Sequence, residues 1–257
     1  MPIITLTSDW GLKDYYLAVV KASIYSQLPD VNIVDISHLV PQYDIAQASY
    51  IVKNAYSYFP KESIHIIAIN TVASIETPHI AIYADGHYFI GADNGIFSLI
   101  FDKTPEKIVE LDITQDSDYF TFSTKDVFVK AACIIAKGGN IDDLGTTKNQ
   151  LHIKNPLLSI NNENSILGNI VYIDVYENLI TNISEAEFKK IQRGRPFSIE
   201  VRKNNIYKLS KSYNDVPEGE LLALFGSNGM LQIALNTSKA KSLLGLNYDD
   251  KITVTFS

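Results

Sequence analysis

Cysteine is nearly absent from this chain of 257 residues, which contains only Cys133. An intrachain disulfide is therefore excluded, and so is a zinc site built on cysteine pairs. Cys133 lies in the apolar run 129–136, where we expect a buried and unreactive side chain. The sequence also lacks an apolar run of membrane-spanning length and a basic N-terminal region followed by an apolar core. We therefore expect a cytoplasmic protein without a membrane partner.

A surplus of positive charge is missing as well. The chain has 22 Lys and Arg against 29 Asp and Glu, which gives a net charge of −7 and a pI near 5.2. That balance argues against a broad polyanion-binding surface, so we expect no nucleic-acid partner. The glycine patterns that bind dinucleotides or nucleoside triphosphates do not follow any expected strand. We also find no helical histidine pair and no Gly-x-Ser-x-Gly elbow, so we expect no metal, no cofactor and no serine hydrolase.

What remains is a globular composition, 46% hydrophobic and 20% charged, with enough residues for one large or two modest domains. Through residue 154, strand-like and helix-like segments alternate. Strands are expected at 3–8, 31–36 and 64–70, a hairpin around Asp85-Gly86, and helices after Asp14, after Asp44 and over 125–137. This alternation predicts an α/β domain with a mostly parallel sheet over residues 1–154.

The chain becomes polar and irregular over residues 155–164, which we interpret as a linker. Beyond it, short apolar runs dominate, at 166–173, 197–201, 221–225, 230–235 and 251–256. One helix interrupts them after Ser184, which with Glu187 fits a capping box. Residues 165–257 are therefore predicted to form a smaller all-β domain, either a barrel or a sandwich.

Asp9 is the first candidate functional residue, because it directly follows the opening strand. Ligands of open α/β sheets bind outside the carboxyl ends of strands, and a carboxylate accepts hydrogen bonds from the paired hydroxyls of a ribose. An acidic residue at this place also suits a cap of the turn or of the next helix. The segment alone leaves both interpretations open.

Two polar clusters of the second domain are further candidates. Asp174–Asn178 follows one expected strand, while Gly226–Gly229 separates two others and Asn236 ends the second of them. Side-chain amides such as Asn178 and Asn236 offer both a donor and an acceptor, which an adenine edge requires. Taken separately, each cluster also fits an ordinary hairpin turn.

Taken together in this order, these segments resemble a known family, the S-adenosylmethionine hydroxide adenosyltransferases, relatives of the S-adenosylmethionine-dependent fluorinase and chlorinase. The resemblance covers nearly the whole chain. The matching stretches are Thr7–Gly11, Val34–His38, Asp93–Gly95, Asp174–Asn178 with Thr181–Ile183, and Gly226–Asn236.

The resemblance implies a homotrimer of two-domain subunits that binds S-adenosylmethionine between neighbouring subunits. It implies that Asp9 holds the ribose hydroxyls, that Tyr43 lines the ribose and sulfonium, and that Asp174 and Ser227 hold the methionine ammonium and carboxylate. The other positions implied to contact the ligand are Asn178 and Asn236 at adenine, Tyr213 stacking near it, and Asn94 and Thr124.

The chain departs from the family at the reaction centre. Family members that transfer hydroxide use an Asp, an Arg and a His to orient the attacking water, and the matching positions here are Asn70, Thr77 (or the adjacent Pro78) and Ser123. None of these three side chains is a base near neutral pH. Glu76 and His79 lie in the altered loop and are candidates for a replacement base pair.

A further departure is Glu177, which replaces a family glycine and brings a new charge beside the implied adenine site. Three functions therefore stay open. We expect an enzyme that cleaves the C5′–S bond of S-adenosylmethionine with water to give adenosine and methionine. The alternatives are a catalytically degenerate protein that binds an adenosyl ligand and, ranked last, a halide adenosyltransferase with Ser123 and Thr124 as halide seat.

Overall fold

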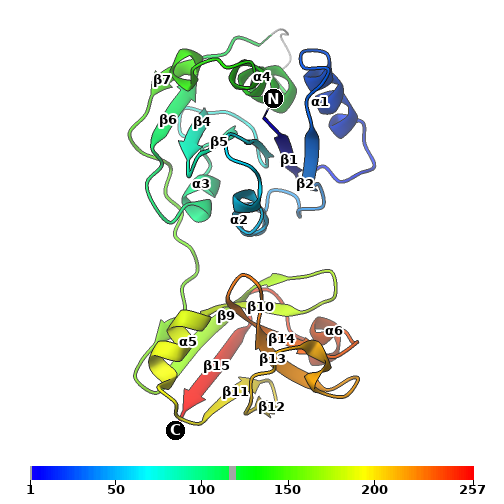
Figure 1. The fold of residues 1–257 in the computed structure, drawn as a ribbon, viewed down its shortest axis with the longest axis vertical. Helices are drawn as coiled ribbons and strands as arrows, with labels where there is room; N and C mark the ends of the chain where they lie inside the picture. Colours follow the sequence, from blue (N-terminus) through cyan, green and yellow to red (C-terminus); the bar gives the residue numbers. More distant parts are fainter. Residues whose placement is uncertain (1, 116–119) are drawn as a thin grey trace. The chain divides into compact units, whose positions relative to one another are not determined.

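A computed structural model describes residues 2–115 and 120–257, and the chain divides into two compact units, Met1–Asn155 (unit 1) and Pro156–Ser257 (unit 2) (Figure 1). Each unit has a hydrophobic core of its own. Within the described residues, no helix combines the length and the hydrophobicity that crossing a membrane requires.

Unit 1 contains a seven-stranded sheet in the order β2-β1-β3-β5-β4-β6-β7. The strands are β1 Ile4–Ser8, β2 Ile33–Ser37, β3 Ile64–Ala68, β4 His79–Ala84, β5 His87–Ala92, β6 Lys107–Leu111 and β7 Gly145–Thr147. The α/β class is confirmed, but the sheet is mixed, because only β2, β1, β3 and β5 pair in parallel. The β4–β5 hairpin reverses direction at Asp85 and Gly86, whose φ of 50° and 75° suit a tight hairpin turn.

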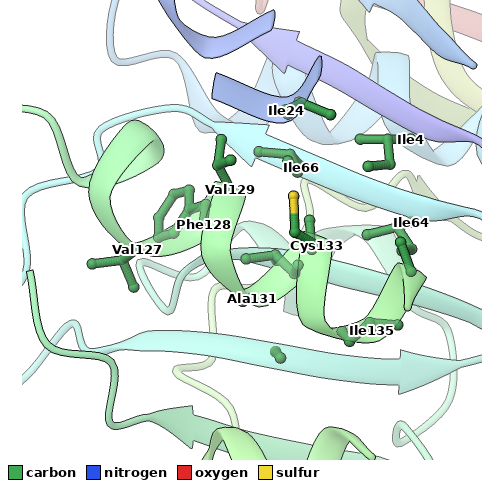
Figure 2. Close-up of a cluster of buried hydrophobic side chains, with 14 of the residues drawn as sticks. Ile4, Ile24, Ile64, Ile66, Val127, Phe128, Val129, Ala131, Cys133 and Ile135 are labelled. Atoms are coloured by element: carbon green, nitrogen blue, oxygen red, sulfur yellow. The ribbon is translucent and has the colours of Figure 1, made fainter. Parts of the chain in front are cut away.

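Helices cover both faces of this sheet. They are α1 Tyr16–Tyr25, α2 Ile45–Lys53, α3 Ile96–Ile100 and α4 Val129–Ala136, with short turns η1 Tyr56–Tyr58 and η3 Ile141–Leu144. Side chains of α1 and α4 pack on one face against β1 and β3, where Cys133 lies among Ile24, Ile64 and Ile66 (Figure 2). The alternate residues of β3 face α2 and α3 on the other side. Burial raises the pKa of Cys133 to about 11, which leaves the thiol unreactive.

The helix expected over 125–137 is in fact two segments. A π-turn, η2 Thr124–Phe128, precedes α4. π-turns inside helices are frequent at functional sites, and hydrophobic periodicity does not reveal them because they change the hydrogen-bond ladder and not the apolar pattern.

Unit 2 is an antiparallel sheet in the order β12-β11-β15-β9-β10-β14-β13. The strands are β8 Ile160–Asn161, which pairs with β9 only, β9 Ser165–Ile173, β10 Leu179–Ser184, β11 Phe197–Val201, β12 Asn204–Ile206, β13 Leu221–Phe225, β14 Met230–Leu235 and β15 Lys251–Phe256. The edge strands β12 and β13 approach each other, so the sheet is nearly a closed barrel. Its helices are α5 Glu185–Gln192 and α6 Ala240–Leu244, with a 3-10 turn η4 Tyr213–Asp215.

The predicted capping box of α5 is half formed. The Ser184 hydroxyl accepts the Glu187 N–H at 3.2 Å, as expected of an N-cap. The Glu187 carboxylate, however, accepts a hydrogen bond from the Ser159 hydroxyl, at 2.7 Å from its Oε2. It thereby fastens the segment that leads into β8 to the start of α5.

Candidate functional site

The candidate residues of unit 1 gather at the carboxyl edge of its sheet. Asp9, Asn70 and Asn94 lie just beyond the ends of the parallel strands β1, β3 and β5. His79 starts the antiparallel strand β4 opposite Ala92, so it lies at the same edge. Because β1 has β2 on one side and β3 on the other, the strand order reverses here, and such a switch point is where open α/β sheets bind ligands.

Asp9 and Tyr43 are brought together. The Asp9 Oδ2 accepts the backbone N–H of Tyr43 at 2.8 Å. Tyr43 has a φ of 63°, and its ring is exposed. The carboxylate therefore fixes a strained turn of the neighbouring loop, and it does not cap α1, whose N-cap, Tyr15, makes no side-chain hydrogen bond.

Asn94 and Asn70 also meet. The Asn94 amide donates to the carbonyl of Ile69 at 3.0 Å and to that of Asn70 at 3.3 Å. Asn70 has a φ of 47°, a left-handed conformation that asparagine tolerates better than most residues. Asn94 thus holds the chain just beyond β3 in place, and Asn70 is exposed.

Thr77 is bound within its own turn. Its N–H donates to the Ser74 hydroxyl at 3.0 Å, and the two hydroxyls lie 2.8 Å apart. Glu76 between them is exposed. The turn is therefore closed by its own hydrogen bonds and directs Glu76 into solvent.

His79 is buried and has a defined tautomer. Its Nε2 lies 2.8 Å from the carbonyl of Thr71, and because a carbonyl only accepts, Nε2 carries the proton and Nδ1 is the basic nitrogen. Burial lowers the pKa of His79, although the Thr71 carbonyl opposes this shift. The ring packs edge-on against Phe128 at 4.8 Å. The expected Glu76–His79 pair does not form among the described contacts, because Glu76 is exposed whereas the ring of His79 is buried.

Ser123 and Thr124 begin the π-turn η2 and are both buried. Within the described residues, the Thr124 hydroxyl has no hydrogen-bond partner although its oxygen is inaccessible to solvent. An unpaired buried hydroxyl costs about 1–3 kcal/mol, so such groups are usually satisfied by a ligand or a water molecule. The η2 turn packs against β5, beside the carboxyl edge.

The candidates of unit 2 lie on the outer face of its sheet. Leu179, Ala223 and Ile233 face the main core, so the alternation of side chains turns their neighbours outward. The outward set follows from the register: Tyr172, Asp174, Asn178, Ile180, Leu224, Gln232, Ala234 and Asn236.

Asp174 and Asn178 form one hydrogen-bonded turn. The Asp174 Oδ1 accepts the Asn178 N–H at 2.8 Å, and its Oδ2 accepts the Asn178 side-chain amide, also at 2.8 Å. The Asn236 amide donates to the carbonyl of Val216 at 2.8 Å. With their NH₂ groups bound in this way, both amides present their carbonyl oxygens, which suit a donor such as the exocyclic amino group of adenine.

Ser227 lies away from these residues. It belongs to the turn between β13 and β14, at the end of β14 opposite to Asn236. Between the two ends, the Tyr213 hydroxyl donates to Gln232 Oε1 at 3.0 Å. Burial, with the charge of Asp174 nearby, raises the pKa of Tyr213. A Cβ at Gly226 would collide with Gln232 Nε2, so the glutamine fills the space between Tyr213 and the turn that carries Ser227.

The carboxylate of Glu177 is bound by residues at the start of α6 and does not pair with Asn178. Glu177 has a φ of 64°, a left-handed conformation that glycine adopts more readily than glutamate. Its carboxylate accepts the Ser242 N–H of α6 at 2.9 Å and lies 3.3 Å from the Lys239 ammonium. The hydrogen bond to Ser242, with that to Lys239, lowers the pKa of Glu177. The carboxylate thus ties the adenine-side turn to α6.

Several residues at these sites were not among the predicted contacts. Asp93 is fully buried and holds Lys148 at 2.9 Å and the His152 N–H at 2.9 Å, which fastens the segment 148–152 to the carboxyl edge. Gln232 was also missed, although it is the one polar residue inside β14 and alternation turns it outward. Among the described residues, no group of three His, Cys, Asp or Glu side chains is placed to hold a metal ion.

Comparisons with known proteins cover both units. A family model described as the SAM hydroxide adenosyltransferase N-terminal domain matches residues 4–145, and one described as the C-terminal domain of the same family matches residues 168–253. An (R)-S-adenosyl-L-methionine hydrolase of Methanocaldococcus jannaschii is 29% identical to this chain, over 100% of this chain and 97% of that protein. An (R)-S-adenosyl-L-methionine hydrolase of Thermus thermophilus is 28% identical, over 93% of this chain and 94% of that protein.

A solved structure has the same fold. The crystal structure of an uncharacterized conserved protein from Thermotoga maritima matches with a TM-score of 0.89 and 25% identity, over 98% of this chain and 100% of that one.

Proposed function

The chain belongs to the SAM hydroxide adenosyltransferase family, and we propose from this premise that it hydrolyses S-adenosyl-L-methionine to adenosine and L-methionine. The observation that carries the proposal is the full-length likeness to hydrolases, over 97% and 94% of the two relatives, combined with an acceptor, Asp9, at the switch point of unit 1. The relatives' names specify the (R) form of the substrate, so we propose the (R) epimer for this chain as well.

In the proposed reaction, a water oxygen attacks C5′ on the side opposite to sulfur. The electron pair of the C5′–S bond passes to sulfur, which neutralises the sulfonium, and the water loses a proton. Asp9 accepts from the ribose hydroxyls beside Tyr43, while Asn178 and Asn236 receive the adenine amino group with Tyr213 alongside. Asp174 binds the ammonium and Ser227 the carboxylate of the methionine moiety.

We propose His79 as the base that takes the proton from water. Its Nδ1 carries the lone pair, and its lowered pKa keeps the ring neutral at pH 7. Asn70, Thr77 and Ser123 occupy the family's catalytic positions without titrating near neutral pH.

The direct test is incubation with each epimer of S-adenosylmethionine, followed by chromatography for adenosine. Product above the background rate supports the proposal. Calorimetric binding without turnover supports the degenerate binding protein instead, and 5′-chloro-5′-deoxyadenosine formed in chloride supports the halide transferase. An absence of both binding and turnover contradicts all three functions.

Asp9→Asn tests the ribose contact, because it replaces a charged acceptor with a neutral amide of the same shape. We expect KM to rise about 10- to 100-fold, as for the loss of hydrogen bonds to a charged group. The matched control is Asp14→Asn, an exposed acid five residues on, which should leave KM unchanged. Equal KM values for the two variants would remove Asp9 from the site.

We further propose that the active form is a homotrimer in the cytoplasm, without a cofactor and without a nucleic-acid partner. The net charge of −7 supports the absence of a nucleic-acid partner. The single, buried cysteine supports the cytoplasmic location. Light scattering after size exclusion tests the assembly, which should have three times the mass of the 28.7 kDa chain.

A further inference from the structure

A line of neighbouring polar side chains joins the ends of β1 and β2, outside the residues assigned above. The Ser8 hydroxyl is hydrogen-bonded to His38 Nδ1 at 2.6 Å, and His38 Nε2 lies 3.1 Å from the Asp35 carboxylate, an ion-pair distance without hydrogen-bond geometry. Asp35 in turn holds the Lys21 ammonium of α1 at 2.6 Å. Ser8 and His38 are 1% and 4% exposed, so this end of the line is buried at the carboxyl edge, whereas the Lys21–Asp35 pair lies at the surface.

The residue types of this line are those of a serine nucleophile, but the geometry excludes that role. The Ser8 oxygen is enclosed, so no substrate reaches it, and Ser8 is the last residue of β1 and does not occupy a sharp strand-to-helix elbow. The ring has a defined orientation instead. We assign the proton to Nε2, because a lone pair there would face the Asp35 carboxylate at 3.1 Å, and Nδ1 then accepts the Ser8 hydroxyl proton.

His38 contacts the chain on both sides of Asp9. Its ring holds Ser8, the residue before Asp9, and its carbonyl accepts the N–H of Gly11, two residues after Asp9, at 2.8 Å. Asp9 itself binds the N–H of Tyr43, which belongs to the loop that His38 begins. The two strand-end loops are therefore fixed to each other at three points around the carboxylate.

We propose that His38 is a positioning residue for Asp9, which holds the carboxylate in the orientation that accepts a ribose diol. The inference rests on the proposed function for its ligand. His38 does not touch the ligand. It acts through Ser8, Gly11 and the turn at Tyr43, and the negative charge of Asp35 near Nε2 favours the required tautomer.

The test compares His38→Ala, His38→Asn and His38→Gln. The asparagine amide occupies the place of Nδ1 and keeps a partner for Ser8, whereas the longer glutamine places its amide near the position of Nε2. We expect KM for S-adenosylmethionine to rise about tenfold in the alanine and glutamine variants, with kcat within about threefold, and to return most of the way in His38→Asn.

A matched control is available on the same strand. Thr5 of β1 binds the ring of the buried His65 at 2.7 Å, but Thr5 lies four residues before Asp9. We expect His65→Ala to destabilise the protein without changing KM. If it raises KM as His38→Ala does, the effect is one of general stability and the positioning role is wrong.

A second readout needs no ligand. Hydrogen exchange of the Tyr43 amide in the unliganded protein reports its bond to Asp9, and we expect His38→Ala and Ser8→Ala to accelerate it while His65→Ala does not. Unchanged exchange and unchanged KM would overturn the inference. If the wild-type chain neither binds nor cleaves S-adenosylmethionine, the proposed function fails, and the exchange rates still decide whether His38 orients Asp9.

Discussion

At the scale of single residues, the proposed base, His79, depends on one backbone contact. His79 occupies the start of β4, where the backbone carbonyl of Thr71 fixes its tautomer. The ring needs no carboxylate partner for this orientation, which is why the exposed Glu76 is dispensable in the proposed reaction. A buried neutral imidazole with a free Nδ1 suffices for a reaction whose leaving group is already a sulfonium.

His79→Gln should therefore lower kcat about 10²- to 10⁴-fold, the usual contribution of a general base, while Glu76→Gln should change kcat less than about twofold. The lowered pKa of His79 also sets the pH dependence, because the ring takes up its proton at a lower pH than a free imidazole does. We expect kcat/KM to decline on the acid side with a midpoint below 6.5. A steady-state profile that declines with a midpoint at or above 6.5 would assign the proton to another group.

Sequence reasoning identified these residues by type and order, but not by their contacts. Asp9 and Asn178 were found because polar residues at strand ends are few. His38 lay within a matched stretch, yet nothing in the one-dimensional pattern shows that its ring reaches Ser8 on the neighbouring strand. The Thr124 hydroxyl was similarly placed by order alone, and its lack of a partner emerged only from the packing of the π-turn.

At the scale of elements, the buried carboxylate of Asp93 fastens the segment 148–152 to the end of β5. Lys148→Met should leave this carboxylate buried without its counter-ion and cost about 3–5 kcal/mol of the free energy of unfolding. The matched control, Lys53→Met, breaks a pair whose Asp102 side chain is 81% exposed, and should cost less than about 1 kcal/mol. Urea denaturation followed by the fluorescence of Trp10, the only tryptophan, measures both in unit 1. Similar losses of unfolding free energy in the two variants would show that the Lys148–Asp93 pair does not hold the segment 148–152 to β5.

The strands of unit 2 were predictable almost to the residue, because apolar runs bounded by polar turns leave few alternatives. The runs expected at 197–201, 221–225, 230–235 and 251–256 coincide with β11, β13, β14 and β15. The mixed sheet of unit 1 was harder to predict from the sequence. Its parallel half follows from strand–helix alternation, but the direction of β6 and β7 depends on pairing between distant segments. Short elements such as β8, β12 and α6 owe their form to tertiary contacts.

At the scale of the whole molecule, the stability of unit 1 depends on histidines that are buried without charge. Burial, together with the charge of His87, lowers the pKa of His65 to about 3. Burial also lowers the pKa of His87, whose ring nitrogen lies 3.4 Å from that of His65. Between about pH 3 and 6.5 the unfolded chain binds protons that the folded chain does not, so stability falls as the pH falls below 6.5.

His65 contributes a slope of up to about 1.4 kcal/mol per pH unit in that window, and His87 adds to it in the same direction. We expect urea midpoints from Trp10 fluorescence to decrease from pH 7 to pH 5, and His65→Gln to reduce the slope. A midpoint independent of pH, or the same slope in wild type and variant, would show that the buried histidines do not control acid stability.

The division into two units sets the last expectation. Each unit buries a separate set of apolar side chains, so residues 1–155 and 156–257 produced as separate chains should each unfold cooperatively in thermal circular dichroism. Neither should release adenosine, because Asp9 and His79 belong to unit 1 whereas Asp174, Asn178 and Asn236 belong to unit 2. Full hydrolysis by unit 1 alone would mean that the outer face of unit 2 does not bind the substrate. A unit 2 that fails to fold alone would instead show that its barrel needs unit 1 for stability, since its own core would then be insufficient.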